Sequence, residues 1–304
     1  MPSVALATCR EFPSLDADDR LVLPELERLG LTPVPAVWTD VDVDWASFAA
    51  VVLRETWDYS ERRDEFLAWT RRVADVTLLL NPAAVVEWNT DKRYLRDLAD
   101  AGVPVVPTLF VAPSDDPDGW RPPEGYDDFV VKPAVSAGSR DTVRYSASGP
   151  MDAPRSQVRR LLEAGRTVMV QPYLDAVDAA GETAVLFIGG EYSHAIRKGP
   201  LLVRGVEGAR VEGLFVEEQI DPREPSADEL AVARDVVARI PGGADAVLYA
   251  RVDLIPDPMG RPQLLELELT EPSLFLAHSA GAPTRLASAI ARHAGIDPDA
   301  APRR

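Results

Sequence analysis

The sequence has almost no cysteine and no long apolar run. Its 304 residues include one cysteine, Cys9, which lies in a short apolar segment. A single thiol cannot form an intramolecular disulfide, so we expect a buried thiol in a reducing compartment. No apolar run reaches the roughly 18 residues of a membrane-spanning helix, and a basic segment followed by an apolar one is missing at the N-terminus. We therefore predict a cytoplasmic protein that is neither secreted nor inserted in a membrane.

Positive charge is scarce as well. The formal net charge is −17, while nucleic acids and anionic membranes are bound by basic surfaces. Neither is therefore expected as a partner. The hydrophobic fraction of 46% excludes a disordered chain, and the length suffices for two or three packed lobes. The composition favours a globular chain of the size of an enzyme.

Lysine is nearly absent. Of 32 Lys and Arg residues, only Lys92, Lys132 and Lys198 are lysine. Arginine serves most surface roles of lysine, so the few lysines that remain are expected where a compact, flexible ammonium is needed, such as beside phosphate oxygens. The base composition of the genome is an alternative explanation, which the lysines by themselves leave open.

Two acidic segments near the end of the chain give the clearest positive signal. Arg251 and Asp253 share one side of an expected strand, and Glu266 and Glu268 share one side of the next. Leucines are expected on the opposite side of the second strand, at Leu265, Leu267 and Leu269. Facing carboxylates repel and need a cation, and hard oxygen ligands suit Mg²⁺. The pattern predicts a Mg²⁺ site, with a solvated acidic hairpin as the alternative.

Strand and helix signals alternate over the first eighty residues, which is typical of a βαβ lobe with a parallel sheet. Strands are expected at 4–8, 34–38, 50–53 and 77–80, with helices at 17–29 and 62–73. A further helix is predicted from Thr90 to Ala101, with Lys92 in its first turn. Later strands are expected at 129–133, 168–174, 182–188, 192–196, 246–255 and 263–269, and helices at 228–240 and 284–294.

A loop of small residues follows the expected strand 129–133. Ser136, Gly138 and Ser139 would let backbone N–H groups approach an anion closely. The loop lacks the glycine patterns of a P-loop and of a dinucleotide fingerprint. A plain hairpin turn is therefore the alternative.

Taken in this order, the segments resemble the ATP-grasp superfamily, which includes D-alanine:D-alanine ligase and glutathione synthetase. Arg251-x-Asp253 and Glu266-x-Glu268 resemble the family's Arg-x-Asp and Glu-x-Asn pair, which holds two Mg²⁺ ions on ATP. Glu268 stands where Asn is usual, and its extra charge predicts tighter metal binding.

The resemblance implies an α/β fold of ATP-grasp architecture. An N-terminal βαβ lobe with a parallel sheet would precede two α+β lobes that clamp ATP between antiparallel sheets. The implied bounds are 1–88 for the N-terminal domain, 89–176 for the central subdomain, 177–296 for the C-terminal subdomain and 297–304 for a frayed tail.

The resemblance also implies roles for individual residues. The metal ligands would be Asp253, Glu266 and Glu268, and the catalytic residues Arg251, Lys198 and Ser139. Nucleotide binding is implied for Lys92, Lys132, Ser136, Gly138, Gln171, Tyr173, Leu174 and Glu182. For Arg251 the alternative is an ion pair with Glu266 that organises the sheet. The implied cofactors are ATP and two Mg²⁺ ions, with Mn²⁺ as a substitute, and the implied closing loops are 136–139 and 198–213, the second of which equally fits a plain exposed loop.

Substrate residues are harder to read. Arg54 and Asp58 follow the third strand, and ligands of parallel sheets lie at the carboxyl ends of strands, so they are candidates for a substrate carboxylate and ammonium. In the alternative, Trp57 and Tyr59 pack a lobe interface while Arg54 neutralises Asp58. Glu271 and Ser273, which follow the second acidic strand, are further candidates.

The implied activity is that of an ATP-dependent ligase, which activates an amino-acid-type carboxylate as an acyl phosphate for attack by an amine. The length, the Trp57-Asp-Tyr59 run and Trp88-Asn-Thr-Asp-Lys92 are similar to the cyclo-ligase of cycloserine biosynthesis, which closes O-ureidoserine. An ATP-grasp kinase or a non-catalytic ATP-binding module are the alternatives. The expected partner is a small amino-acid-like molecule, and a homodimer is left open.

Overall fold

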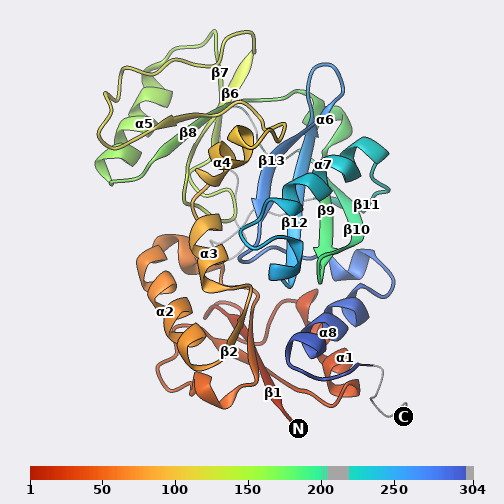
Figure 1. The fold of residues 1–304 in the computed structure, drawn as a ribbon. Coiled ribbons are helices and arrows are strands. Elements are labelled where there is room, and N and C mark those ends of the chain that lie inside the picture. Colours follow the sequence, from red (N-terminus) through yellow and green to blue (C-terminus); the bar gives the residue numbers. More distant parts are fainter. Residues whose placement is uncertain (201, 203, 205–218, 299–304) are drawn as a thin grey trace.

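Three sheets organise the described part of the chain, as Figure 1 shows for a computed structural model of the protein. The structure describes residues 1–200, 202, 204 and 219–298. Most of the predicted closing loop 198–213, and most of the predicted frayed tail 297–304, therefore lie outside the described residues.

The N-terminal lobe is built on a parallel sheet with the strand order β2-β1-β3-β4. Its strands are β1 (Ser3–Thr8), β2 (Thr32–Val37), β3 (Ala50–Leu53) and β4 (Leu78–Leu80). Its helices are η1 (Asp19–Val22), α1 (Leu23–Arg28), η2 (Trp45–Ser47), η3 (Trp57–Glu61) and α2 (Arg63–Val76). The central strands β1 and β3 are almost wholly buried, which explains their nearly continuous apolar runs, while the edge strand β2 is only partly buried. The predicted βαβ lobe is confirmed.

The predicted helix from Thr90 to Ala101 is wrong at its start. Two shorter helices occupy this region, α3 (Ala83–Asn89) and α4 (Tyr94–Asp100), and Lys92 lies in the turn between them. The backbone N–H of Lys92 donates to Ala134 O at 2.9 Å. This tertiary bond takes the donor that a continuous helix would use, so Lys92 is not in a first helical turn.

The central lobe carries an antiparallel sheet with the order β5-β8-β6-β7. Its elements are β5 (Leu109–Val111), β6 (Asp128–Pro133), β7 (Val143–Ser146), α5 (Asp152–Glu163), β8 (Val168–Pro172) and α6 (Ala176–Ala180). Val158 and Leu161 of α5 pack on one face of the sheet, against Val131 and Val170. The opposite face is left for the space between the lobes.

The C-terminal lobe carries a second antiparallel sheet, in the order β11-β10-β9-β12-β13. Its strands are β9 (Glu182–Ile188), β10 (Glu191–Lys198), β11 (Ile220–Pro222), β12 (Tyr249–Pro256) and β13 (Pro262–Glu268). Its helices are α7 (Ala227–Ala238) and η4 (Ala244–Ala246). Helix α7 begins with a capping box between Ser226 and Glu229. Helices α4 and α7 cover one face of the sheet, which leaves the face with the acidic side chains toward the central lobe.

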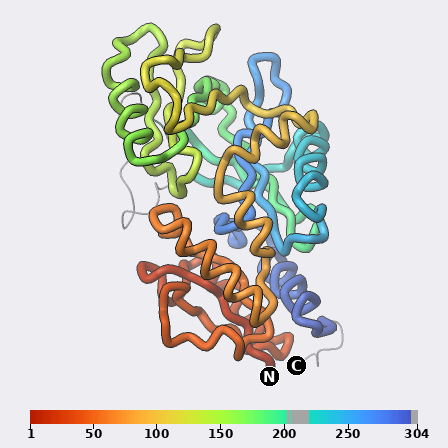
Figure 2. The backbone as a smooth tube through the Cα atoms, turned by 60° about the vertical axis from the view of Figure 1, so that its left-hand side comes forward, coloured from red at the N-terminus to blue at the C-terminus, as the bar shows by residue number. Residues whose placement is uncertain are grey.

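The N-terminal and C-terminal lobes share one hydrophobic core. Helix α8 (Ala282–His293), which follows η5 (Leu276–His278), packs on α1 and on the β9–β10 hairpin, and it lies beside α1 in Figure 1. The buried Asn81 side chain donates to Tyr249 O (3.0 Å) and Leu269 O (2.7 Å) and accepts from Leu248 N (2.6 Å). These bonds join the two lobes, while Figure 2 shows the central lobe standing apart from the N-terminal sheet.

No helix in the described part of the chain combines the length and the apolar composition that a bilayer crossing requires. The Cys9 thiol is buried, and burial raises its pKa to about 12. The predicted buried thiol is therefore confirmed.

Candidate active site

A cavity of about 420 Å³ is lined by residues of all three lobes. The residues predicted as catalytic, nucleotide-binding and metal-binding all lie on its wall, together with Glu271 and Ser273. They come from parts of the chain as far apart as Lys92 and Glu268. The structure thus brings together the predicted residues, while their roles stay predictions.

Strands β12 and β13 place the acidic side chains at facing positions. Arg251 pairs with Glu268 and Asp253 with Glu266, and a β-bulge follows, at which Leu254 pairs with Leu264. The bulge inserts Leu265 as an extra residue, so the simple alternation predicted for the leucines is wrong there. Leu265 packs in the cluster that lines the cavity, and the opposite face instead holds Leu264, Leu267 and Leu269.

Arg251 is the centre of an ion-pair network on this face. Its Nε lies 3.0 Å from Asp253 Oδ1 and its Nη2 3.0 Å from Asp253 Oδ2, and Nη2 also donates to Glu268. Nη1 donates to Ser273 O at 3.2 Å. The alternative prediction, a pair with Glu266, differs from the structure, in which Glu266 pairs with Lys92.

Two lysines approach the same carboxylates from other elements. Lys198 Nζ lies 2.7 Å from Asp253 Oδ2 and 2.9 Å from Glu182 Oε2. Lys92 Nζ lies 3.1 Å from Glu266 Oε1 and donates to Ser136 O at 2.8 Å. Lys132 on β6 lines the cavity, and no hydrogen bond or ion pair joins its Nζ to another described residue.

Burial and charge shift the pKa values of these groups in different directions. Burial opposes ionisation of Asp253, but Arg251 and Lys198 outweigh it and lower its pKa. The pKa of Glu266 is lowered in the same way, mainly by the ammonium group of Lys92. Burial raises the pKa of Glu268 to about 7, against the pull of Arg251, and raises that of Glu271 to about 8. Burial also lowers the pKa of Lys132. Cationic partners therefore stabilise the charged forms of Asp253 and Glu266, while burial opposes the charged forms of Glu268 and Lys132.

Asp253, Glu266 and Glu268 offer a donor set for a divalent metal. All three supply hard carboxylate oxygens from two neighbouring strands, and such oxygens suit Mg²⁺. Each carboxylate is held by a cation, which shows that the fold supplies positive charge where three acids meet. The donor chemistry is that of a magnesium site, and the ligand roles of these residues stay predictions.

Apolar side chains form the opposite end of the cavity, next to the segment that follows β8. Tyr173 and Leu174 pack with Val130, Ile255 and Leu265. The Arg144 guanidinium lies 3.5 Å from the centre of the Tyr173 ring. Gln171 Nε2 donates to Thr108 Oγ1 at 2.8 Å. This end of the cavity is mostly apolar.

The loop between β6 and β7 contains the small residues of 136–139. It is a hairpin connection, as the alternative predicted, and it also lines the cavity. Gly138 (φ 59°) and Ser139 (φ 57°) adopt left-handed conformations. That conformation is unfavourable for a serine, so it indicates a loop shaped by its surroundings.

Arg54 and Asp58 do not line the cavity, in contrast to the prediction. Arg54 is 2% exposed, and its Nε bonds Asp19 Oδ2 at 2.8 Å while Nη2 donates to Pro272 O at 3.0 Å. Asp58 accepts from Trp38 Nε1 at 2.7 Å. Both side chains have partners inside the N-terminal lobe or at its joint with the C-terminal lobe. The alternative, an Arg54–Asp58 pair, is therefore wrong, and the substrate roles stay untested predictions.

The cavity wall also includes residues that the sequence did not single out as a site. Asp16 lines it from the loop after β1, and Phe275 lines it from the segment before η5. Trp57 and Tyr59, predicted only as interface residues, line it as well, and Trp57 Nε1 donates to Glu271 O at 3.0 Å. The signal for Asp16 was its place at the carboxyl end of a parallel strand.

Comparison with known sequences gives a consistent result. The family model of the N-terminal domain of the D-cycloserine synthetase DcsG matches residues 4–81. The cycloserine biosynthesis protein DcsG of Streptomyces lavendulae is 40% identical over 302 residues, which cover 96% of this chain and 98% of that protein.

Solved structures show the same fold. The crystal structure of D-cycloserine synthetase DcsG matches with a TM-score of 0.83 and 36% identity, over 96% of this chain and 99% of that one. The D-alanine–D-alanine ligase of Bacillus anthracis, complexed with ATP, matches at 0.61 and 13% identity over 97% of each chain. The ATP-grasp ligase PsnB, complexed with Mg and ADP, matches at 0.59 and 20% identity, over 96% of this chain and 99% of that one. The predicted ATP-grasp fold is confirmed, and the predicted ATP and Mg²⁺ are supported in general terms.

Proposed function

Because the chain belongs to the D-cycloserine synthetase family of ATP-grasp ligases, we propose that it closes a ring in an O-ureidoserine-like amino acid with the help of ATP and Mg²⁺. Family membership confirms the predicted class, an ATP-dependent ligase of antibiotic biosynthesis that forms C–N bonds. The proposal adds the substrate and the intramolecular second step.

One observation carries this proposal. The scarce lysines Lys92, Lys132 and Lys198 line the same cavity as the acidic pair of strands. Genome composition explains why lysine is rare, but it does not explain why all three lysines face one cavity. A triphosphate with its metal accounts for both the ammonium groups and the carboxylates.

We assign the parts of the nucleotide to the parts of the cavity. The adenine would lie at the apolar end beside Gln171, Tyr173 and Leu174, with its ribose near Glu182. The phosphates would be bound by the three lysines and by the 136–139 loop, and they would replace Glu266 and Asp253 as partners of Lys92 and Lys198. Asp253, Glu266 and Glu268 would hold Mg²⁺, two ions in our proposal and replaceable by Mn²⁺. Bound there, the metal would neutralise charge on the phosphates.

The reaction has two steps. A carboxylate oxygen of the substrate attacks the γ-phosphorus, the bond to ADP breaks, and an acyl phosphate forms. The ureido nitrogen of the same molecule then attacks the acyl carbon, phosphate leaves, and the nitrogen loses its proton. Arg251 would stabilise the transferring phosphoryl group and the tetrahedral adduct, because preorganised cations act without reorganisation of solvent. Ser139, on the 136–139 loop, would help to keep water from the acyl phosphate.

The proposal is tested by product analysis with the D and L forms of O-ureidoserine. With Mg²⁺ and ATP, one of them should release ADP and phosphate in equal amounts and yield a cyclic product by mass spectrometry. Serine, which lacks the ureido nitrogen, is the substrate control. EDTA should abolish ADP release, and added Mg²⁺ or Mn²⁺ should restore it. A stable phosphorylated substrate would indicate a kinase instead, and ATP binding without turnover would indicate a binding module.

The lobe bounds belong to the same proposal. We keep 1–88, 89–176 and 177–296 as units, which the separate sheets of the three lobes support. A homodimer and a cytoplasmic location likewise stay predictions. Size-exclusion chromatography with light scattering tests the first of these.

A further inference from the structure

Strand β13, which carries Glu266 and Glu268, lies at the edge of its sheet. In the order β11-β10-β9-β12-β13, β12 is the strand that pairs with it in the described part of the chain. An edge strand leaves a row of N–H and C=O groups on its outer side without partners from the sheet. Leu267 and Leu269 are buried there, and buried backbone groups need hydrogen bonds. The outer side of β13 must therefore find its partners elsewhere.

Two side chains from the region of α3 and α4 take the place of a further strand. Tyr94 Oη donates to Leu267 O and accepts from Leu267 N, both at 2.8 Å. Asn89 Nδ2 donates to Leu267 O at 2.8 Å, and its Oδ1 accepts from Leu269 N at 2.8 Å. Burial raises the pKa of Tyr94, so the hydroxyl keeps the proton that it donates. Side chains thus hold this part of the edge.

The held residue lies between the two carboxylates. Glu266 and Glu268 line the cavity, while Leu267 packs in the core on the opposite face of the sheet. Consecutive Cα atoms are a fixed distance apart, so hydrogen bonds that fix the backbone of Leu267 also fix both of its neighbours. The bonds at Leu267 therefore set the two points from which the carboxylates reach into the cavity.

The turn between Asn89 and Tyr94 is itself anchored on other parts of the molecule. Lys92 N donates to Ala134 O of the central lobe at 2.9 Å, and Arg63 Nε of α2 donates to Thr90 Oγ1 at 2.9 Å. Such a turn cannot shift without moving its neighbours, so it is a rigid support for the edge of β13.

We propose that Asn89 and Tyr94 are positioning residues, which hold the backbone of β13 so that Glu266 and Glu268 can bind a divalent metal together. The inference rests on the proposed function, which makes these carboxylates metal ligands. Groups that orient metal ligands from behind typically change metal affinity about 10- to 100-fold when they are removed. Loss of these hydrogen bonds should therefore appear first in metal affinity.

The test uses Tyr94→Phe, which keeps the ring in the core and removes the hydroxyl. Mn²⁺ is titrated into the protein with ADP present, and free Mn²⁺ is measured by electron paramagnetic resonance. We expect about 10-fold weaker Mn²⁺ binding in the variant. Calorimetry with ADP in EDTA should show an affinity changed less than about twofold, because the lysines that face the phosphates are untouched. General damage to the site would weaken both.

The metal dependence of turnover gives a second readout. In Tyr94→Phe the Mg²⁺ concentration for half-maximal ADP release should rise about 10-fold, while kcat at saturating Mg²⁺ should stay within about threefold of the wild type. A role in the reaction itself would instead lower kcat at every Mg²⁺ concentration.

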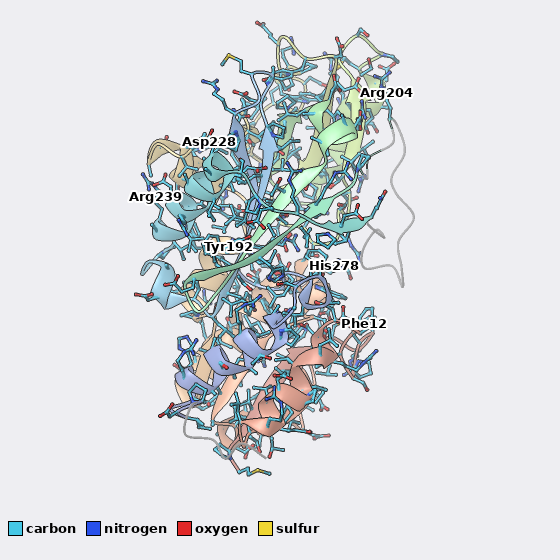
Figure 3. The ribbon with its side chains drawn as sticks, turned by 90° about the vertical axis from the view of Figure 1, so that its right-hand side faces the viewer. Phe12, Tyr192, Arg204, Asp228, Arg239 and His278 are labelled. Carbon is cyan, nitrogen blue, oxygen red and sulfur yellow. The ribbon has the colours of Figure 1, made fainter. Side chains whose placement is uncertain are left out.

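A control and a second variant complete the design. Tyr192→Phe, at a half-buried tyrosine of β10 in the same sheet that Figure 3 labels, should leave metal affinity unchanged. If Tyr94→Phe does not fold, Asn89→Ala takes its place. Asn89 lines the cavity, so water can reach the backbone groups that this change frees, and the same loss of metal affinity is expected.

Two results would overturn the inference: unchanged Mn²⁺ affinity in a folded variant, or equal losses of Mn²⁺ affinity and of metal-free ADP affinity. Failure of the proposed function is a separate result. A wild-type protein that binds Mn²⁺ with ADP, and loses affinity in Tyr94→Phe, but does not cyclise O-ureidoserine would refute the cyclo-ligase and leave the positioning role standing.

Discussion

The two polar ends of the cavity differ in how their charges are balanced. At the end built by β12, β13 and the lysines, each of Asp253, Glu266 and Glu268 has a cationic partner within the protein. At the end on the N-terminal lobe, Arg54 pairs with Asp19, and burial beside Asp19 raises the pKa of Glu55 to about 9, so that Glu55 holds a proton at neutral pH. A site whose carboxylates are already paired with cations can exchange these ion pairs for a ligand that carries both positive and negative charge, such as a metal-bound phosphate. A site that is compensated in part by a proton offers fewer ion pairs for such an exchange, so we expect the nucleotide at the first end.

The largest expected effect is at Arg251, on the balanced side. In Arg251→Lys the charge stays, but the planar group that contacts Asp253 and Glu268 is lost. We expect kcat to fall about hundredfold, because one preorganised donor to a developing charge is removed. ADP release measures this, with thermal unfolding as a check on folding.

Arg239→Lys is the matched control, at an exposed arginine of α7's end that Figure 3 labels away from Phe12. It should keep the full rate. A normal kcat for Arg251→Lys would mean that Arg251 only stabilises the sheet and takes no part in the reaction.

A smaller effect on activity is expected at Lys132. There the same substitution should weaken ATP binding and raise the stability of the fold. Lys132→Met should raise KM for ATP about tenfold, because a charge-assisted bond to phosphate is lost, and should leave amino-acid affinity unchanged. Burial lowers the pKa of Lys132, so the unfolded chain holds this proton more tightly than the folded one. The ammonium therefore destabilises the fold at neutral pH, and the variant should melt at a higher temperature.

The sign of this effect gives its pH dependence. Stability of the wild type should rise as the pH increases through the lowered pKa toward the ordinary value of Lys, so the advantage of Lys132→Met should shrink at alkaline pH. Melting curves of both proteins between neutral and alkaline pH check this. A variant that melts lower at every pH would contradict it.

The smallest effect is expected at Trp57, at the end of the cavity on the N-terminal lobe. Trp57→Phe keeps a ring against Phe12 but loses the Nε1 hydrogen bond to Glu271 O. One such bond contributes about 1 kcal/mol, so KM for the amino acid should rise about fivefold while KM for ATP stays constant.

Trp120→Phe is the control for this change, because Trp120 Nε1 is buried without a hydrogen-bond partner among the described residues. Steady-state kinetics should show no effect there. A rise in the KM for ATP in Trp57→Phe would place the ring at the nucleotide instead.

Local pattern predicted much of this architecture, and tertiary contacts decided the rest. The apolar runs of the parallel sheet and the alternation along β12 and β13 are local signals, and both predicted their elements. The bulge at Leu265, the bond from Lys92 N to Ala134 O and the pairing of Arg54 with Asp19 depend on partners elsewhere in the chain. A sequence pattern shows which residues are charged, but it does not show which partner a buried guanidinium contacts. For that reason the sequence predicts Arg54 at the cavity, where the structure instead has Asp16.

The position of α8 has a consequence for biosynthesis of the chain. Leu286 and Ile290 of this last helix fill the same core as Val22 and Leu26 near the beginning. A ribosome must therefore translate the chain beyond residue 290 before the core of the first lobe can be completed. Until then the apolar side chains of α1 lack the partners that α8 provides.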